Sequence, residues 1–219
     1  GNHEWKVHKI LENQKEIEMK DLQQELFGDN FIVDGILDPP IKDTDTLFYI
    51  IDTTSINDHP FEITIQDIIQ KRTSNTKNIC FFGHEPIISL KYSNRPENKK
   101  KNKKAKRKEW QILEKLLELF TEITSTFSDE NYNYQYICAD THNYQSMEIM
   151  LSTGTPINQT VVGCGGTFDL DPLPINIEDT AIHFNNIDKG ILHVQIRKAV
   201  NTHHGFCIFD TDTQSHEFI

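Results

Sequence analysis

The sequence lacks long apolar runs and internal repeats. No stretch approaches the roughly 20 consecutive apolar residues that a membrane-spanning helix requires, so we expect no membrane association. No signal peptide precedes Gly1 either, which favours an intracellular protein, cytoplasmic or nuclear, while N-terminal targeting stays open because we expect residues upstream of Gly1. With 219 residues and 37% hydrophobic content, the chain is long enough to bury one sizeable core, and a globular protein is the default interpretation.

Close cysteine pairs are also missing. Such pairs would indicate a zinc site or a redox dithiol. Each of the four cysteines instead lies in or beside an apolar run, which is typical of buried thiols in a reducing compartment. These residues are Cys80, Cys138, Cys164 and Cys207.

Basic residues are scarce outside one segment. The stretch from Lys99 to Lys108 carries eight of the 22 Lys and Arg residues and no acid, which leaves 14 basic against 33 acidic residues elsewhere. The rest of the protein would repel nucleic acid, so contact with a polyanion would run through this segment. Its composition predicts a mobile insertion around residues 95–108 of a single domain that spans residues 1–219. A solvated loop, nuclear targeting and nucleic-acid docking are all open interpretations.

Three short apolar runs have the pattern of buried strands that end in polar loops. In an α/β sheet, ligands are held by the loops beyond the carboxyl ends of the strands, so polar residues there are candidates for a site. The runs are Leu47 to Ile51, Ile79 to Phe82 and Tyr134 to Cys138.

Helical spacing of apolar residues predicts two amphipathic helices, one from Trp5 to Phe27 and one from Trp110 to Phe127. After Cys138 the pattern changes to short strands separated by turn signals. Early alternation of strand and helix, followed by strands alone, predicts an α/β core that is closed by an antiparallel or mixed sheet. The later strands are expected at Met147 to Leu151, Thr160 to Val162, Ala181 to Phe184, Ile191 to Ile196 and Phe206 to Phe209.

Three polar clusters each contain a histidine, and two of them directly follow predicted strands. A single cluster would be weak support for a site, because a lone loop histidine is more often solvated than a ligand. Together, neutral imidazoles, an Asn carbonyl and carboxylates are what a divalent ion such as Zn²⁺, Mn²⁺ or Fe²⁺ accepts. The clusters are Gly1-Asn2-His3-Glu4, Gly83-His84-Glu85-Pro86 and Asp140-Thr141-His142-Asn143.

In this order the three clusters resemble the third, fourth and fifth conserved blocks of the calcineurin-like metallophosphoesterases. The segment from Val161 to Thr167 resembles the glycine-rich strand and turn that follow the last block, and His204-Gly205-Phe206 resembles the closing strand. The resemblance covers essentially the whole chain. It implies a four-layer α/β/β/α sandwich and hydrolysis of phosphate esters by a dinuclear metal centre.

The resemblance also implies metal ligands. Asn2 and His84 would bind one ion, and His142 would bind the other. Asp140 stands where the family usually has a histidine, and it can serve as an oxygen ligand. A carboxylate is a harder ligand than an imidazole, so this replacement can change which of the Mn, Fe and Zn ions the site prefers.

His3 would be the catalytic histidine, which stabilises charge on the phosphoryl group or protonates the departing oxygen. Glu4 would orient His3, and Glu4 and Asn143 are the expected substrate-binding residues. Two ions about 3.5–4 Å apart would clamp the phosphoryl oxygens and make hydroxide available for in-line attack. The acidic stretch from Asp169 to Asp171 and the pair His203-His204 are expected to be surface features, in a region where family members often line the substrate cleft.

The family's first two blocks, Asp-x-His and Gly-Asp, are not found in this sequence. We expect that the natural chain is longer and carries them upstream of Gly1. The alternatives are that another chain supplies these strands, or that the protein no longer binds two metals. In the last case the rival function is a non-catalytic scaffold that binds protein or nucleic acid through its basic segment.

Deletion of residues 99–108 tests the nucleic-acid interpretation. If the segment docks a polyanion, its removal should flatten the salt dependence of binding, because each lost phosphate contact lowers the slope of log K against log salt by about 0.9. Fluorescence anisotropy with a labelled duplex over a series of salt concentrations measures this slope. An unchanged slope would leave the solvated-loop interpretation.

Overall fold

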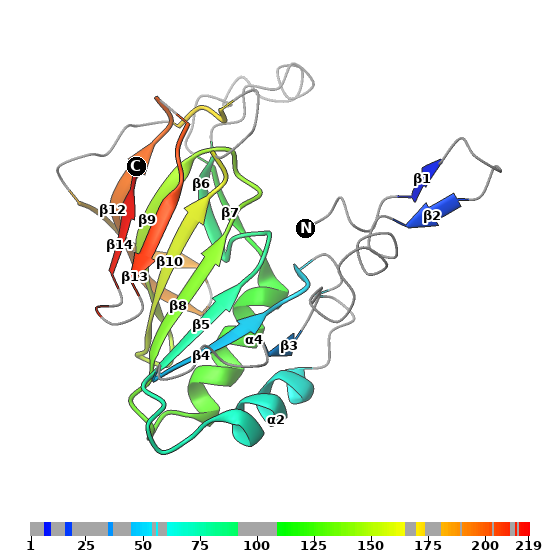
Figure 1. Cartoon of the computed structure of the whole chain (residues 1–219). Coiled ribbons are helices and arrows are strands. Elements are labelled where there is room, and N and C mark those ends of the chain that lie inside the picture. Colours follow the sequence, from blue (N-terminus) through cyan, green and yellow to red (C-terminus); the bar gives the residue numbers. More distant parts are fainter. Residues whose placement is uncertain are drawn as a thin grey trace.

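Figure 1 shows the computed structural model of the chain. The structure describes residues 7–9, 16–18, 35–36, 45–53, 56, 61–91, 109–164, 170–173, 181–188, 190–202, 204–210, 213 and 215–219. Within these ranges it contains two helices and an eight-stranded mixed sheet, which confirms the predicted α/β class. The four-layer α/β/β/α arrangement stays a prediction.

The large sheet contains β3 (Gly35–Ile36), β4 (Thr46–Ile50), β5 (Asn78–Phe82), β8 (Asn133–Cys138), β9 (Tyr144–Leu151), β10 (Pro156–Val162), β11 (Ile182–Asp188) and β12 (Ile191–Val200). Three further strand pairs form separate two-stranded sheets: β1 (Val7–Lys9) with β2 (Glu16–Glu18), β6 (Ile88–Lys91) with β7 (Glu109–Ile112), and β13 (Cys207–Asp210) with β14 (Ser215–Phe218). The helices are α2 (Phe61–Lys71) and α4 (Glu114–Thr126).

The strand order in the large sheet is β11-β12-β9-β10-β8-β5-β4-β3. Strands β10, β8, β5 and β4 run parallel to one another. Strands β3, β9, β11 and β12 pair antiparallel with their neighbours. The carboxyl ends of the four parallel strands therefore meet along one side of the sheet, which we call the carboxyl edge.

Helices α2 and α4 cover one face of the parallel strands (Figure 1). The ring of Phe120 in α4 lies edge-on to Phe81 and Tyr136, with centroids 5.0 and 5.1 Å away. Tyr49 of β4 donates a hydrogen bond to Asp67 of α2 over 3.2 Å. Tyr49, Phe81 and Tyr136 are in register across the sheet, and side chains alternate along a strand, so both helices lie on the same face.

Strand β6 packs on this same face and is held there by two glutamines. Gln159 of β10 accepts a hydrogen bond from the Ile87 N–H over 2.7 Å and donates to the Ile88 carbonyl over 2.6 Å. Gln145 of β9 makes the matching pair with the backbone of Leu90, at 2.9 and 3.2 Å. Both glutamines are fully buried. Two side-chain amides thus satisfy backbone groups that would otherwise be buried without partners.

The C-terminal hairpin of β13 and β14 packs on the opposite face. Phe218 of β14 stacks on Tyr144 of β9, with ring centroids 4.3 Å apart. Tyr144 directly precedes Gln145 in the strand, so the two side chains point to opposite faces. A small second core forms here from Tyr144, Cys164 and Val200, with Leu170 and Phe218 packed against them.

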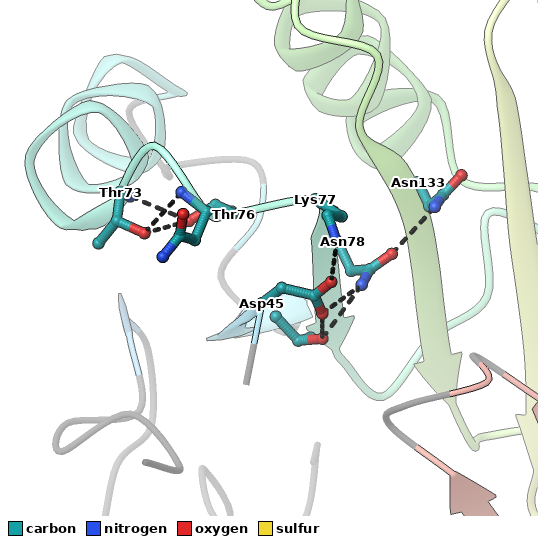
Figure 2. A network of polar contacts seen from close by, with 8 residues as sticks. Asp45, Thr73, Thr76, Lys77, Asn78 and Asn133 are labelled. Atoms are coloured by element: carbon teal, nitrogen blue, oxygen red, sulfur yellow. Dashed lines mark hydrogen bonds and ion pairs between the residues drawn. The ribbon is translucent and has the colours of Figure 1, made fainter. Parts of the chain in front are cut away.

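A polar network at the amino ends of the parallel strands, away from the carboxyl edge, fixes how three of them align (Figure 2). Asn78 at the start of β5 donates to the Asp45 carboxylate over 2.8 Å and accepts from the Asn133 side chain of β8 over 3.0 Å. Asp45 directly precedes β4, and its carbonyl accepts hydrogen bonds from the N–H groups of Lys77 and Asn78. Asn78 is buried. The network therefore links β4, β5 and β8 in one register.

The helix predicted from Trp5 to Phe27 is wrong over the residues that the structure describes. Strands β1 and β2 replace it. They pair with each other, and His8 lies opposite Ile17. Five polar residues interrupt the apolar stripe between Leu11 and Ile17. A helix here would have a broken apolar face, and packing of that face supplies most of the stability of a helix.

The helix predicted from Trp110 to Phe127 is confirmed from Glu114 onward. Trp110 lies instead in β7, opposite Leu90 of β6, because strand pairing overrides a local helical pattern. Each strand predicted after Cys138 overlaps an observed strand. Sequence patterning did not predict α2 or the β6–β7 pair.

All four cysteines are free thiols, as predicted. Three of them are buried, whereas Cys207 is partly exposed. Burial raises the pKa of the Cys80 thiol to about 12, so this thiol stays protonated at neutral pH and is a poor nucleophile. Burial also raises the pKa of Cys138 well above its ordinary value.

The basic stretch at residues 99–108 lies outside the described residues, so its mobility and its nucleic-acid docking stay predictions. The strands on either side of it, β6 and β7, pair with each other, and Lys91 lies opposite Glu109. Among the residues that the structure describes, no helix combines the length and the apolar character needed to cross a bilayer.

Replacing Gln159 with Leu tests whether the Gln159 amide holds β6 on the large sheet. We expect the free energy of unfolding to fall by about 2–4 kcal/mol, because the Ile87 N–H and the Ile88 carbonyl lose their partner inside the core. Urea unfolding measures this loss. The matched control is Gln66→Leu on the exposed side of α2, which should change stability by less than about 0.5 kcal/mol. Equal effects of the two substitutions would contradict the prediction.

Candidate functional site

Backbone hydrogen bonds at the carboxyl edge tie neighbouring loops together. The Ala139 N–H after β8 donates to the His84 carbonyl after β5 over 2.9 Å. The Gly83 N–H donates to the Ile137 carbonyl over 3.0 Å. The clusters predicted after β5 and β8 therefore lie side by side, as the parallel topology requires.

The turn that carries His84 is clamped from both sides. On the β4 side, the Thr53 hydroxyl accepts hydrogen bonds from the N–H groups of His84 and Glu85, each over 3.2 Å. The same hydroxyl donates to the Glu85 carboxylate. On the β8 side, the Tyr136 phenol donates to the Glu85 carbonyl over 2.5 Å. Burial raises the pKa of Tyr136 well above its ordinary value, so the phenol stays protonated and remains a donor.

Gly83 is required because this clamp leaves no room for a side chain. A Cβ at this position would lie 2.3 Å from the Tyr136 Oη and 2.9 Å from the Thr53 Cγ2. Both atoms belong to the residues that hold the turn. The glycine before His84 is thus explained by close packing in this turn.

His84 and Asp140 face each other at the ends of β5 and β8. The His84 Nε2 lies 3.6 Å from the Asp140 Oδ1, and the side chains are 24% and 30% exposed. This separation is too long for a hydrogen bond. Asp140 has a φ of 51°, in the left-handed region that non-glycine residues seldom adopt. Residues in such conformations concentrate at functional sites.

His142 is exposed, and Asp171 holds its backbone. The His142 N–H donates to the Asp171 carboxylate over 2.9 Å, and the His142 carbonyl accepts from the Asp171 N–H over 2.8 Å. Gly163 at the end of β10 lets this loop approach closely. A Cβ on Gly163 would lie 1.9 Å from the Thr141 carbonyl oxygen.

Asn143 is completely buried. Its Oδ1 accepts a hydrogen bond from the Gln145 Nε2 over 2.8 Å, and its Nδ2 donates to the Asp171 carbonyl over 3.4 Å. In this arrangement the amide supports the loop from inside the core. The substrate contact expected of Asn143 stays a prediction.

Of the predicted site residues, the structure brings His84 and Asp140 together. Within the described part of the chain, no three His, Cys, Asp or Glu side chains form a group that could hold a metal ion. The predicted residues Asn2, His3 and Glu4 lie outside the described residues. Next to Asp140, the Thr141 hydroxyl is buried and has no hydrogen-bond partner among the described residues.

Sequence analysis missed the roles of Thr53, Tyr136 and Asp171. Each acts on a residue 29 to 51 positions away in the chain, so no local pattern marks it. Asp171 belongs to the acidic stretch that we expected to be a surface feature. The structure shows that Asp171 is partly exposed and that its side chain also anchors the His142 loop. The alignment of the strands, which no single motif encodes, creates these contacts.

Comparison with protein-family models finds no match for this chain, and comparison with curated proteins finds no similar sequence. The resemblance to metallophosphoesterases therefore rests on the motifs quoted above.

Gly83→Ala should destabilise the protein by about 1–3 kcal/mol, because the added methyl group overlaps the Tyr136 hydroxyl and the Thr53 methyl group. Tyr136→Phe should cost about 1–2 kcal/mol through the unpaired Glu85 carbonyl. The double variant should lose less stability than the sum of the two, because removal of the hydroxyl relieves part of the overlap. Urea unfolding of all four proteins measures the coupling, and strict additivity would contradict this account of Gly83.

Proposed function

We propose that the protein is a metal-dependent phosphoesterase whose reaction takes place at the carboxyl edge. The observation that carries this proposal is the His84–Asp140 pair, an imidazole nitrogen and a carboxylate oxygen 3.6 Å apart at the ends of adjacent parallel strands. Ligand sites in α/β sheets lie at this position. The proposal includes the four-layer sandwich, of which the described residues supply one sheet and the helices on it.

The pair fits a divalent ion. Two protein ligands that each bond to one ion at about 2.0–2.2 Å, with angles from about 90° to tetrahedral, have donor atoms about 2.8–3.6 Å apart. The observed 3.6 Å lies at the upper end of this range and is too long for a direct hydrogen bond. An imidazole and a carboxylate suit Mn²⁺, Fe²⁺ or Zn²⁺.

The resemblance assigns Asn2 and His84 to one ion and His142 to the other. We assign Asp140 to the ion of His84 because the two side chains lie 3.6 Å apart. When bound, such ions supply Lewis acidity: they neutralise phosphoryl charge and lower the pKa of water towards neutrality. The substrate class is a phosphate ester, either a monoester or a diester.

The chain's own residues would position the reacting groups. Thr53 and Tyr136 hold the backbone of the His84 turn, which would limit the positions that the imidazole can take before substrate arrives. His3 would donate a proton to the departing oxygen or stabilise charge on the phosphoryl group, and histidine is the side chain that most often serves in such proton transfer. Glu4 would keep His3 in the required orientation.

The test combines metal content with hydrolysis of an aryl phosphate and the corresponding diester in the presence of Mn²⁺. For the full-length protein we expect close to two ions per chain. In His84→Ala and Asp140→Ala we expect loss of bound metal and a fall in kcat/KM by at least about 100-fold. Elemental analysis and initial rates measure the two effects.

His193→Ala is the matched control. His193 pairs with Met150 near the end of β9, on the side of the sheet away from the carboxyl edge. Metal content and activity should therefore stay at the wild-type level in this variant. A full-length protein with no bound metal and no hydrolysis would overturn the proposed function and leave the binding scaffold as the better explanation.

A further inference from the structure

Asp171, from a distant part of the chain, makes two hydrogen bonds to the loop that carries His142. The Asp171 carboxylate accepts a hydrogen bond from the His142 N–H over 2.9 Å, and the Asp171 N–H donates one to the His142 carbonyl over 2.8 Å. These two bonds engage the peptide groups on both sides of His142. Together they restrict the backbone dihedrals of His142 and thus the direction in which its side chain leaves the backbone.

Asp171 is itself held in place. Its carbonyl accepts hydrogen bonds from the side-chain amides of Asn143 and Asn201, each over 3.4 Å. Leu170, which directly precedes it, packs against the small core around Tyr144 on the face of the C-terminal hairpin. Asp171 is therefore fixed both through its carbonyl and through its neighbour in the chain.

The support of His142 differs from that of His84. Thr53 and Tyr136 clamp the His84 turn from the two neighbouring strands. His142 is exposed and sits past the end of β8. The bond from its N–H to a carboxylate is charge-assisted and is stronger than a bond between neutral groups.

We propose that Asp171 is a positioning residue that orients His142 towards the ion it would bind. This role rests on the proposed function. Groups that orient a ligand from outside the coordination sphere commonly change metal affinity by about 10–100-fold when they are removed. Asp171 would act through the backbone of His142.

Asp171→Ala, Asp171→Asn and Asp210→Ala in the full-length protein test this role. Asp210 is the matched control, because its carboxylate also accepts a backbone N–H, from Thr213 over 3.0 Å, in the C-terminal hairpin. Two quantities are measured in each variant: hydrogen exchange of the His142 amide by NMR, and Mn²⁺ affinity by titration calorimetry.

In Asp171→Ala we expect exchange of the His142 amide to accelerate at least about tenfold and Mn²⁺ affinity to fall by about 10–100-fold. Asp171→Asn keeps an oxygen acceptor and should restore part of both effects. Asp210→Ala should change neither quantity. Thermal unfolding of each variant confirms that the measurements are made on folded protein.

The outcomes separate this inference from the proposed function. Wild-type protein that binds no Mn²⁺ overturns the proposed function, and the positioning role with it. Wild-type binding with unchanged affinity in Asp171→Ala overturns the positioning role alone. Reduced affinity with unchanged exchange of the His142 amide also overturns it, because Asp171 would then affect the ion by another route.

Discussion

The shared register of the parallel strands is the constraint on which the site depends. Asn78, Asp45 and Asn133 fix this register at one end of the strands, and His84 and Asp140 meet at the other. One residue of slip would move the loops past each other by about 3.3 Å and turn each side chain to the other face of the sheet. The partly buried polar network around Asn78 thus helps to determine which residues meet at the site.

The sequence was sufficient to predict the parts of the fold that have local patterns. The apolar runs that became β4, β5 and β8 and the apolar face of α4 bury their residues as their periodicity indicates. The segment from Trp5 to Phe27 shows the limit, because scattered apolar residues can match a helical period by chance. Trp110 shows another limit, since its environment is decided by the partner strand β6.

The residues of the candidate site also fall into two groups: those that a local sequence pattern marks and those that it does not. The clusters that contain His84 and His142 stand out in the sequence because they follow strand patterns, and the topology brings His84 next to Asp140. The residues that hold them could not be found so readily. Thr53, Tyr136 and Asp171 are ordinary residue types in their local context, and their roles arise when distant segments fold together. Sequence patterns thus marked chemical groups better than they marked the supports of those groups.

The backbone of Asp140 limits which residues can evolve at this position. With φ at 51°, a β-branched side chain would be strained, whereas Asp, Asn and His are the non-glycine residues that accept this region most readily. Substitutions are therefore filtered by backbone conformation, whatever the side chain binds. Aspartate and histidine both pass that filter, yet they differ in ligand hardness. If Asp140 binds the proposed ion, a lineage could exchange one residue for the other and change its preferred ion while the loop keeps its shape.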